Sequence, residues 1–371
     1  METTLHCDAS REKGPGMRQA LSTSAPAEQA TKTPSRFGPY DLVRILGQGG
    51  MGAVYEAWDS RTDTRVAIKV LRRDDAVSCE RFRREIQVLK RLRHKGVVSF
   101  LQDGDCGPRM PWFAMELLQG RTLRDYNSEL WSQSARDAIT LPVHVVGDYD
   151  EPIHVCSPRS GPREVSPVAS RLKEIGRLYE QVFRAVERIH AEGVTHGDLS
   201  PTNVFVRADG SPVLLDFGLA APGRSEVVPD KDENALQPIA GTAHYLAPEQ
   251  IRRERIEPRT DLYSLGCMIY ETLTGTPPFD ALEAAAVLRA HVDLRPTRLS
   301  AFWPRIPAAL EDLVFSLLEK QQQDRPRSAG IVADRLALIV ASEEHGSAGT
   351  HQQSLRSCAA IAAGGQRVEA A

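Results

Sequence analysis

Two carboxylates and one amide near the middle of the chain have residue types and a spacing suited to metal chemistry. Asp198 and Asn203 stand five residues apart on a segment that Pro201 keeps from forming a regular helix. Asp216 follows an apolar run, and residues 203–215 contain two strand-like stretches around an Asp-Gly turn. Such a hairpin would bring Asn203 and Asp216 to the same end, close to Asp198. Oxygen ligands of this kind suit Mg²⁺ that is shared with substrate phosphates, although either acid alone would more simply be a solvated loop residue.

A glycine-rich stretch in the first part of the chain lies between two strand-like segments. The sequence GQGGMG at 47–52 follows the strand pattern of 40–46 and precedes that of 53–58. Dinucleotide-binding folds and P-loops need a helix directly after their glycines, whereas a strand follows here. The stretch therefore predicts a flexible hairpin whose backbone can approach phosphates, because glycine has no Cβ in the way. The alternative is a glycine-rich surface hairpin without a ligand.

A lysine and a glutamate in the next two predicted elements are candidates for an ion pair. Lys69 interrupts the apolar strand pattern of residues 65–70, and a helix is predicted to begin with Ser78 as its N-cap. Apolar residues recur along that helix at helical spacing, namely Phe82, Ile86, Leu89 and Leu92. Glu85 falls inside this stripe, and a carboxylate that faces a core needs a partner. We expect Lys69 to be that partner.

The composition gives no sign of nucleic-acid or membrane binding. Acidic residues number 49 and basic residues 46, for a net charge of −3. The six cysteines are scattered without a C-x-x-C pair, unlike a zinc site or a disulfide framework, which fits a reducing compartment. No signal-peptide pattern opens the chain, and no apolar run approaches the roughly 18 residues of a membrane span. We therefore expect a cytoplasmic protein.

The two ends of the chain differ in composition from the middle. Residues 1–36 and 341–371 are rich in small and polar residues, lack periodicity and are predicted to be disordered tails. Between them, apolar residues at helical spacing predict long helices at 172–190, 261–274 and 331–341.

A proline-containing segment interrupts the middle of the chain. Five prolines within residues 127–170 argue against a helix there. Alternation in 141–146 and 153–156 predicts a small hairpin. Its polar residues His144, His154 and Cys156 could suggest a metal site, but outward-facing strand residues are the preferred interpretation.

Many motifs in a fixed order resemble those of protein kinases of the serine/threonine type. After the stretches described above, the order continues with Asp216-Phe217-Gly218, the sequence GTAHYLAPE at 241–249, and Asp324-Arg325-Pro326. The resemblance covers residues 40–340. It implies an α+β, two-lobed fold with a small β-rich N-lobe (37–117), a larger and mostly helical C-lobe (118–340), and an insertion at about 127–170. It also implies that Arg325 pairs with Glu249.

The resemblance assigns roles residue by residue and implies an ATP- and Mg²⁺-dependent enzyme that phosphorylates serine or threonine hydroxyls of protein substrates. The nucleotide would be held by Leu46, Gly47, Gly49, Gly50, Gly52, Val54, Ala67, Lys69, Met115, Glu116 and Leu118. Lys69 would hold the α- and β-phosphates, braced by Glu85. Asp198 would accept or orient the hydroxyl proton, with Mg²⁺ on Asn203 and Asp216. Regulatory partners would bind through the tails or the insertion.

Two positions depart from the family pattern and leave alternatives open. Gly197 stands where many kinases have arginine, and Ser200 stands where serine/threonine kinases usually have lysine. The sequence His196-Gly197-Asp198, with Asn203 downstream, also resembles the catalytic loop of aminoglycoside and choline phosphotransferases. The pattern of those enzymes has no counterpart of the Ala247-Pro248-Glu249 motif. A small-molecule phosphotransferase is therefore the first alternative. A non-catalytic pseudokinase scaffold ranks lower, since all the catalytic residue types named above are present.

Overall fold

The computed structural model describes most of the chain between residues 35 and 343. The described residues are 35–49, 52–72, 75–105, 110–131, 139–144, 154–158, 168, 171–218, 221–222 and 242–343. The segments predicted as tails lie outside this set except at their inner ends. There, the first strand begins at Arg36 and the last helix runs over 329–343, so regular structure extends slightly into both segments.

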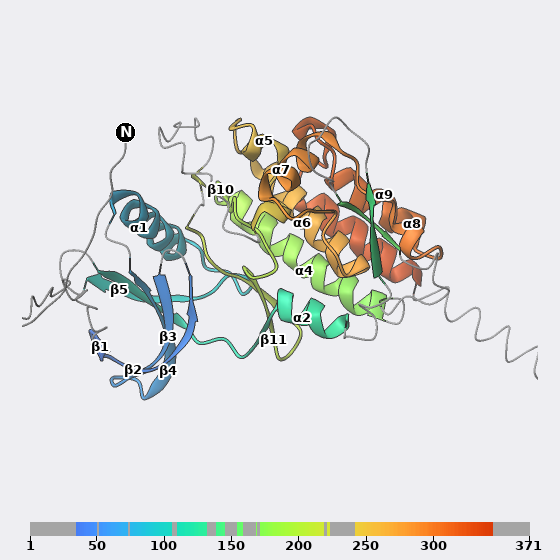
Figure 1. Cartoon of the computed structure of the whole chain (residues 1–371). Helices are drawn as coiled ribbons and strands as arrows, with labels where there is room; N and C mark the ends of the chain where they lie inside the picture. Colours follow the sequence, from blue (N-terminus) through green and yellow to red (C-terminus); the bar gives the residue numbers. More distant parts are fainter. Residues whose placement is uncertain are drawn as a thin grey trace, which may run out of the picture. The chain divides into compact units, whose positions relative to one another are not determined.

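An antiparallel sheet of six strands, in the order β1-β2-β3-β4-β6-β5, forms the first part of the fold (Figure 1). Its strands are β1 Arg36–Phe37, β2 Tyr40–Gln48, β3 Gly52–Asp59, β4 Thr64–Leu71, β5 Phe100–Asp105 and β6 Pro111–Glu116. Side chains alternate between the two faces of a strand. In β4, Val66, Ile68 and Val70 accordingly join one small core. Lys69 lies on the opposite face, toward the helix that follows.

That helix, α1 (Ala76–Arg91), packs on the sheet against β4, β5 and β6 (Figure 1). The predicted stripe is buried and includes Glu85, which is 2% exposed. The predicted N-cap is wrong. The cap is Asp75, whose carboxylate accepts the N–H of Ser78 at 2.8 Å. Both residues are good cap types, and the choice of Asp75 adds one turn to the helix.

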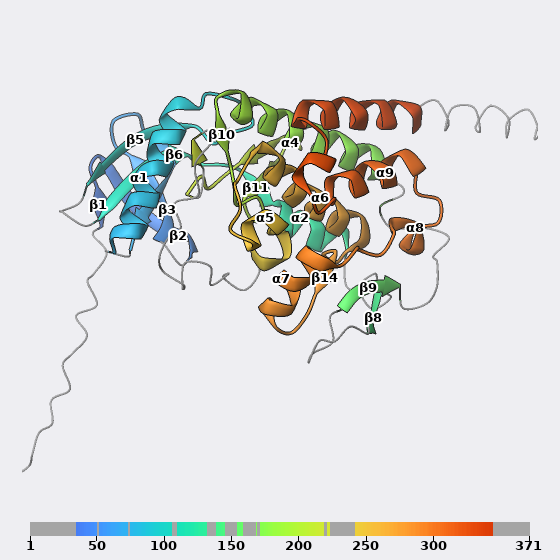
Figure 2. The same cartoon turned by 90° about the horizontal axis from the view of Figure 1, so that it is seen from above.

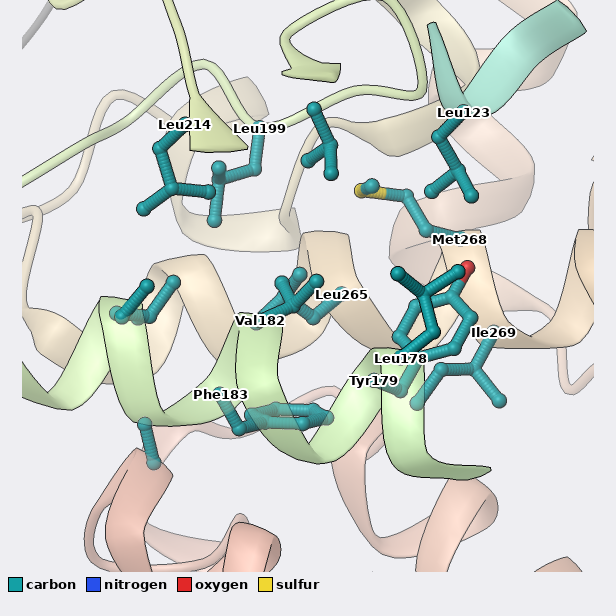
Figure 3. Packing of buried hydrophobic residues seen from close by; sticks show 14 of the residues in the cluster. Leu123, Leu178, Tyr179, Val182, Phe183, Leu199, Leu214, Leu265, Met268 and Ile269 are labelled. Carbon is teal, nitrogen blue, oxygen red and sulfur yellow. The ribbon is translucent and has the colours of Figure 1, made fainter. Parts of the chain in front are cut away.

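The helices α4 (Leu172–Ala191) and α6 (Pro258–Thr274) pack together in the largest hydrophobic core (Figure 3). Figure 3 shows Leu178, Tyr179, Val182 and Phe183 of α4 beside Leu265, Met268 and Ile269 of α6. Leu199 directly follows Asp198, and Leu214 is two residues before Asp216; both leucines lie in the same cluster. The core therefore fixes the segments that carry Asp198 and Asp216. Gly275, with φ of +83°, ends α6 in the left-handed conformation that favours glycine.

Shorter elements complete the described part of the chain. The strands are β7 Gly120–Thr122, β10 Val194–Thr195, β11 Val204–Arg207, β12 Pro212–Leu214, β13 Ala221–Pro222 and β14 Phe279–Asp280. The helices are α2 Leu123–Leu130, α5 Pro248–Ile251, α7 Ala284–Asp293, α8 Leu299–Phe302 and α9 Ala308–Leu317, with 3₁₀ turns at Thr242–Tyr245 and Gln322–Asp324. None of the helices in the described part of the chain combines the length and the apolar character needed to cross a bilayer.

The proline-containing segment forms the predicted hairpin, with strands β8 (Ile139–His144) and β9 (His154–Pro158). Strand β9 also pairs with β14, which joins the hairpin to the segment after α6 (Figure 2). That second pairing was not predicted. The side chains of His144, His154 and Cys156 lie outside the described part of the structure, so their orientation stays a prediction.

A buried ion pair joins two distant segments of the helical region. Arg325 contacts both carboxylate oxygens of Glu249, at 2.7 and 2.8 Å, and the two side chains are 0% and 1% exposed. The guanidinium also lies 4.8 Å from the ring centre of Tyr263 on α6. The pairing implied by the family resemblance is therefore present, and it holds the start of α5 to the chain after α9.

We predict that Arg325→Met lowers the free energy of unfolding by about 3–5 kcal/mol, because Glu249 would be left buried without a counter-charge. Urea unfolding followed by circular dichroism measures this loss. Arg184→Met is the matched control: Arg184 pairs with Asp334 at 2.8 Å, but the side chains are 46% and 67% exposed. Exposed pairs contribute about 0–1 kcal/mol. Equal losses in the two variants would contradict the assignment of Arg325 as a buried structural charge.

Candidate active site

Lys69 is the point at which three segments of the chain meet. Its Nζ lies 2.8 Å from both carboxylate oxygens of Glu85 on α1 and 3.1 Å from Oδ1 of Asp216. The side chains of Lys69 and Glu85 are 11% and 3% exposed, so water solvates these charges poorly. Buried ions need such partners because their desolvation is costly. The predicted pair is present, and the contact with Asp216 adds a third charge to it.

Lys69 stabilises the charge of each carboxylate, and the two carboxylates together stabilise the ammonium group. Burial alone would lower the pKa of Lys69, but the charges of Asp216 and Glu85 outweigh it and hold the pKa above its ordinary value. Burial would raise the pKa of Asp216, but Lys69 holds it below its ordinary value. Burial raises the pKa of Glu85 to about 7 while Lys69 acts in the opposite direction, so this carboxylate depends on Lys69 for its charge. The arrangement keeps one ammonium and one carboxylate ionised side by side where a phosphate could be held.

Asp261 of α6 holds the backbone of the loop that carries Asp198. Its Oδ1 accepts the N–H of Gly197 at 2.8 Å, and its Oδ2 accepts the N–H of His196 at 2.9 Å. The same Oδ2 lies 2.7 Å from Nε2 of His190. Burial would raise the pKa of Asp261, but the hydrogen bond from His190 and the neighbouring charges hold it below its ordinary value. The loop is therefore anchored by an ionised group within the core.

The β11–β12 hairpin brings Asn203 and Asp216 to one end, as predicted. Val204 pairs with Leu214, and the N–H of Leu215 donates to the carbonyl of Asn203 at 2.8 Å. Asn203 Nδ2 donates to the carbonyl of Asp198 at 2.7 Å. Within the described residues, neither Oδ1 of Asn203 nor Oδ2 of Asp216 has a hydrogen-bond partner. Two oxygens are therefore free to act as ligands.

The backbone of Asp216 is in an uncommon conformation. Its φ is +58°, in the left-handed region, where aspartate is tolerated better than most residues. Its Oδ1 accepts the N–H of Gly218 at 3.3 Å. Phe217 is 0% exposed, and its ring lies 4.7 Å from that of His196. Burial of Phe217 on one side and the Lys69 contact on the other hold the carboxylate in place.

Asp198 contacts one of the candidate metal residues, Asn203, whose Nδ2 lies 3.4 Å from its Oδ2. Burial, and after it the charge of Asp216, raise the pKa of Asp198 to about 7. A carboxylate with a pKa near neutrality is suited to accept a proton during a reaction.

The three described glycines of the 47–52 stretch have different surroundings. A Cβ on Gly52 would lie 2.2 Å from the carbonyl oxygen of Val70, so only glycine fits this part of the sheet. A Cβ on Gly47 or Gly49 would meet nothing within 4 Å. These two glycines therefore leave open space beside the backbone, and Gly50 lies outside the described residues.

Four of the residues expected to surround an adenine lie on β4, on β6 and just after β6. Ala67 on β4 pairs with Met115 on β6, which places the two residues side by side. The N–H of Glu116 donates to the carbonyl of Ser99 at 3.0 Å and is therefore already engaged. Leu118, by contrast, makes no backbone hydrogen bond within the described residues, so its N–H and C=O are available to a ligand.

Comparison with known proteins agrees with this geometry. A family model described as a protein kinase domain matches residues 40–336, which is most of the chain. The chain belongs to the protein kinase family.

Curated relatives are bacterial serine/threonine-protein kinases. The chain is 30% identical over 308 residues to PknH of Mycobacterium bovis, covering 82% of this chain and 44% of PknH. It is 32% identical over 307 residues to PknB of Mycobacterium tuberculosis, covering 80% and 42%. It is 33% identical over 299 residues to the probable serine/threonine-protein kinase SCO3848 of Streptomyces coelicolor, covering 79% and 38%. The chain thus matches less than half the length of each of these relatives.

At Ser200, one of the two positions that depart from the kinase pattern, the side chain makes a contact within its own loop. Ser200 Oγ lies 2.9 Å from Oγ1 of Thr202, so its hydroxyl is used within the loop. The hydroxyl of Tyr245 donates to Glu271 at 2.7 Å. The family resemblance implies that the hydroxyl of Thr242 bonds Asp198, and it leaves Ser225 as the candidate regulatory site. The side chain of Thr242 and the whole of Ser225 lie outside the described residues, so both roles stay predictions.

Sequence reasoning missed two residues that organise the kinase site. Asp261 was noted only as a helix start, although a carboxylate within an apolar helix pattern is the same signal that pointed to Glu85. Gln250 was not noted at all. Its Nε2 donates to the carbonyl of Gly197 at 2.8 Å across 53 residues of sequence, and a contact of that separation has no local pattern.

We predict that Glu85→Gln lowers kcat about 10–100-fold, because a charge-assisted hydrogen bond that orients Lys69 contributes about 1.5–3 kcal/mol. Steady-state phosphorylation kinetics measure the loss. Glu80→Gln on the same helix is the matched control: Glu80 pairs with Arg84, and its side chain is 73% exposed. A Glu85→Gln variant as active as the control would show that the pair does not position Lys69 during transfer.

Proposed function

We propose that this chain is a serine/threonine protein kinase that transfers the γ-phosphate of ATP to hydroxyl groups of protein substrates. The observation that carries the proposal is the junction of Lys69 with Glu85 and Asp216, at 2.8 and 3.1 Å. It joins the sheet that carries the glycine-rich loop to the hairpin that carries the metal-ligand candidates. The relatives PknH and PknB are serine/threonine-protein kinases, which supports the same activity.

ATP fits the residues around this junction. Gly47 and Gly49 leave space for phosphates beside the backbone. The unpaired backbone groups of Leu118 suit the edge of adenine, with Ala67 and Met115 alongside. Lys69 would hold the α- and β-phosphates through its ammonium group.

Mg²⁺ fits the donor set of Asn203 and Asp216. Mg²⁺ in nucleotide sites is held by one or two protein groups together with phosphates and water. The free oxygens of these two side chains supply such a set. The ion would neutralise charge on the transferred phosphoryl group.

Asp198 would orient the substrate hydroxyl and receive its proton. Its raised pKa of about 7 suits this role, and its backbone is fixed through Asp261 and Asn203. The buried Glu249–Arg325 pair holds the segment in which kinases bind protein substrates. For this reason we propose protein hydroxyls, rather than small-molecule alcohols, as acceptors. We also propose residues 37–340 as the catalytic domain.

We predict that Asp198→Asn lowers kcat by at least about 100-fold and leaves the Kd for ATP nearly unchanged, because the change removes the proton acceptor and leaves the nucleotide contacts intact. The assay uses labelled ATP with Mg²⁺ and offers generic protein acceptors beside amino-alcohol substrates. Asp209→Asn is the matched control, since Asp209 bonds Ser211 within the β11–β12 turn. Full activity of Asp198→Asn would refute its catalytic role. Labelling of the amino alcohols alone would refute protein kinase activity.

We predict that activity does not depend on phosphorylation of the segment after Gly218. Gly197 offers no side chain to pair with a phosphate there. Between Gly218 and Ala247 the hydroxyl residues are Ser225, Thr242 and Tyr245. A phosphatase-treated sample and a Ser225→Ala variant should keep parent rates within about twofold, and Thr242→Ala should be strongly impaired. A large loss on dephosphorylation that incubation with ATP restores would show a phosphate switch instead.

A further inference from the structure

The peptide that precedes Asp198 is unusually free to rotate. Gly197 has φ of +73°, in the left-handed region, and no Cβ to restrict the following torsion. The carbonyl of Gly197 and the N–H of Asp198 form one planar peptide. A rotation of that plane would therefore turn the backbone from which the Asp198 carboxylate projects. Without an outside contact, this site would lose precision where phosphoryl transfer needs it most.

Gln250 supplies such a contact. Its Nε2 donates to the carbonyl oxygen of Gly197 at 2.8 Å, and its Oε1 accepts the N–H of Ala247 at 3.0 Å. A carboxamide can make both bonds because it has donors on nitrogen and an acceptor on oxygen. One side chain thus joins the segment before α5 to the loop that carries Asp198.

Both ends of this bridge are themselves fixed. Glu249, the residue before Gln250, is held by the buried bidentate contact with Arg325. On the loop side, Asp261 accepts the N–H of Gly197 at 2.8 Å. The N–H of Asp198 donates to Nδ1 of His196 at 3.3 Å. The peptide between residues 197 and 198 is therefore held at its oxygen by Gln250 and at its nitrogen by His196.

We propose that Gln250 is a positioning residue, whose carboxamide fixes the peptide before Asp198 and couples it to the segment that ends at α5. The bridge needs neither a side chain at position 197 nor a phosphate. The inference rests on the proposed kinase function and deepens it. The neutral amide of Gln250 fixes the loop, a task that an arginine at position 197 paired with a phosphate would otherwise perform.

A purely structural role would use a different part of the side chain. If Gln250 only capped α5, the bond from Ala247 N–H to its Oε1 would be sufficient. Gln250→Glu keeps the size and that acceptor but exchanges the Nε2 donor for a carboxylate oxygen facing the Gly197 carbonyl. Gln250→Met removes both bonds. The two variants therefore separate positioning from capping.

At pH 8, Gln250→Glu should lower kcat about 10–100-fold and change the KM for ATP by less than about threefold, because small displacements of a reacting group cost up to about 100-fold. As the pH falls toward 5.5, the glutamate becomes protonated and can again donate to the carbonyl. Burial against a carbonyl raises its pKa and brings this change into reach. The ratio of variant to parent kcat should therefore rise as the pH falls. Gln250→Met should stay low at every pH.

The matched control is Gln322→Glu, since Gln322 Nε2 also donates to a backbone carbonyl, that of Arg255 at 3.0 Å, but in a different part of the chain. This variant should keep the parent kcat. Melting temperatures verify folding. If Gln250→Glu does not fold, Gln250→Met carries the test: lowered kcat at unchanged KM for ATP, with faster hydrogen exchange in the peptide covering 196–200 and unchanged exchange in α5, supports positioning, and parent kcat overturns it.

A second readout is independent of turnover. Hydrogen exchange of the peptide covering 196–200 should be faster in Gln250→Glu than in the parent at pH 8, with no change in α4. A parent without protein kinase activity would contradict the proposed function. An active parent whose Gln250→Glu variant has parent kcat and parent exchange would overturn only the inference about Gln250.

Discussion

A buried ammonium group is the constraint on which this structure depends. Lys69 is 9% exposed and lies in an apolar strand, where an unpaired charge would be very costly. Its two carboxylate partners come from different places, Glu85 on the next helix and Asp216 far along the chain. Satisfying the lysine therefore requires α1 to pack on the sheet and the β11–β12 hairpin to lie against it. The need to neutralise Lys69 therefore determines both how these elements pack and how the candidate site is assembled.

The loop that carries Asp198 is held in place mainly through contacts with its backbone. Asp261 and Gln250 contact the loop that carries Asp198 through its N–H and C=O groups rather than through its side chains. Such contacts are insensitive to which side chain stands at position 197. Glycine at that position is compatible with the site for this reason, and its positive φ is one that glycine adopts without strain. Asp261 lies on α6, which packs with α4 in the largest hydrophobic core.

Several features could be predicted from the sequence because they have local signals. A carboxylate within an apolar stripe pointed to the Lys69–Glu85 pair, and an Asp-Gly turn between apolar runs pointed to the hairpin that joins Asn203 to Asp216. Kinase motifs in order indicated the family and the Glu249–Arg325 pair. The cap of α1 was misassigned because Asp75 and Ser78 are equally good cap residues, so residue type does not distinguish them. The pairing of β9 with β14 and the contact of Gln250 with Gly197 join distant segments without any periodicity, so no sequence pattern could reveal them.

A double-mutant cycle on Lys69→Met and Glu85→Gln, read as kcat/KM for phosphorylation of a protein acceptor, tests the central claim most directly. If the pair acts as one unit that holds the nucleotide phosphates, the double variant should be no slower than Lys69→Met alone, because the role of Glu85 passes through Lys69. Melting temperatures measured in parallel separate this coupling from a loss of folding. Independent losses that multiply in the double variant would contradict the account, because Glu85 would then act on transfer without Lys69.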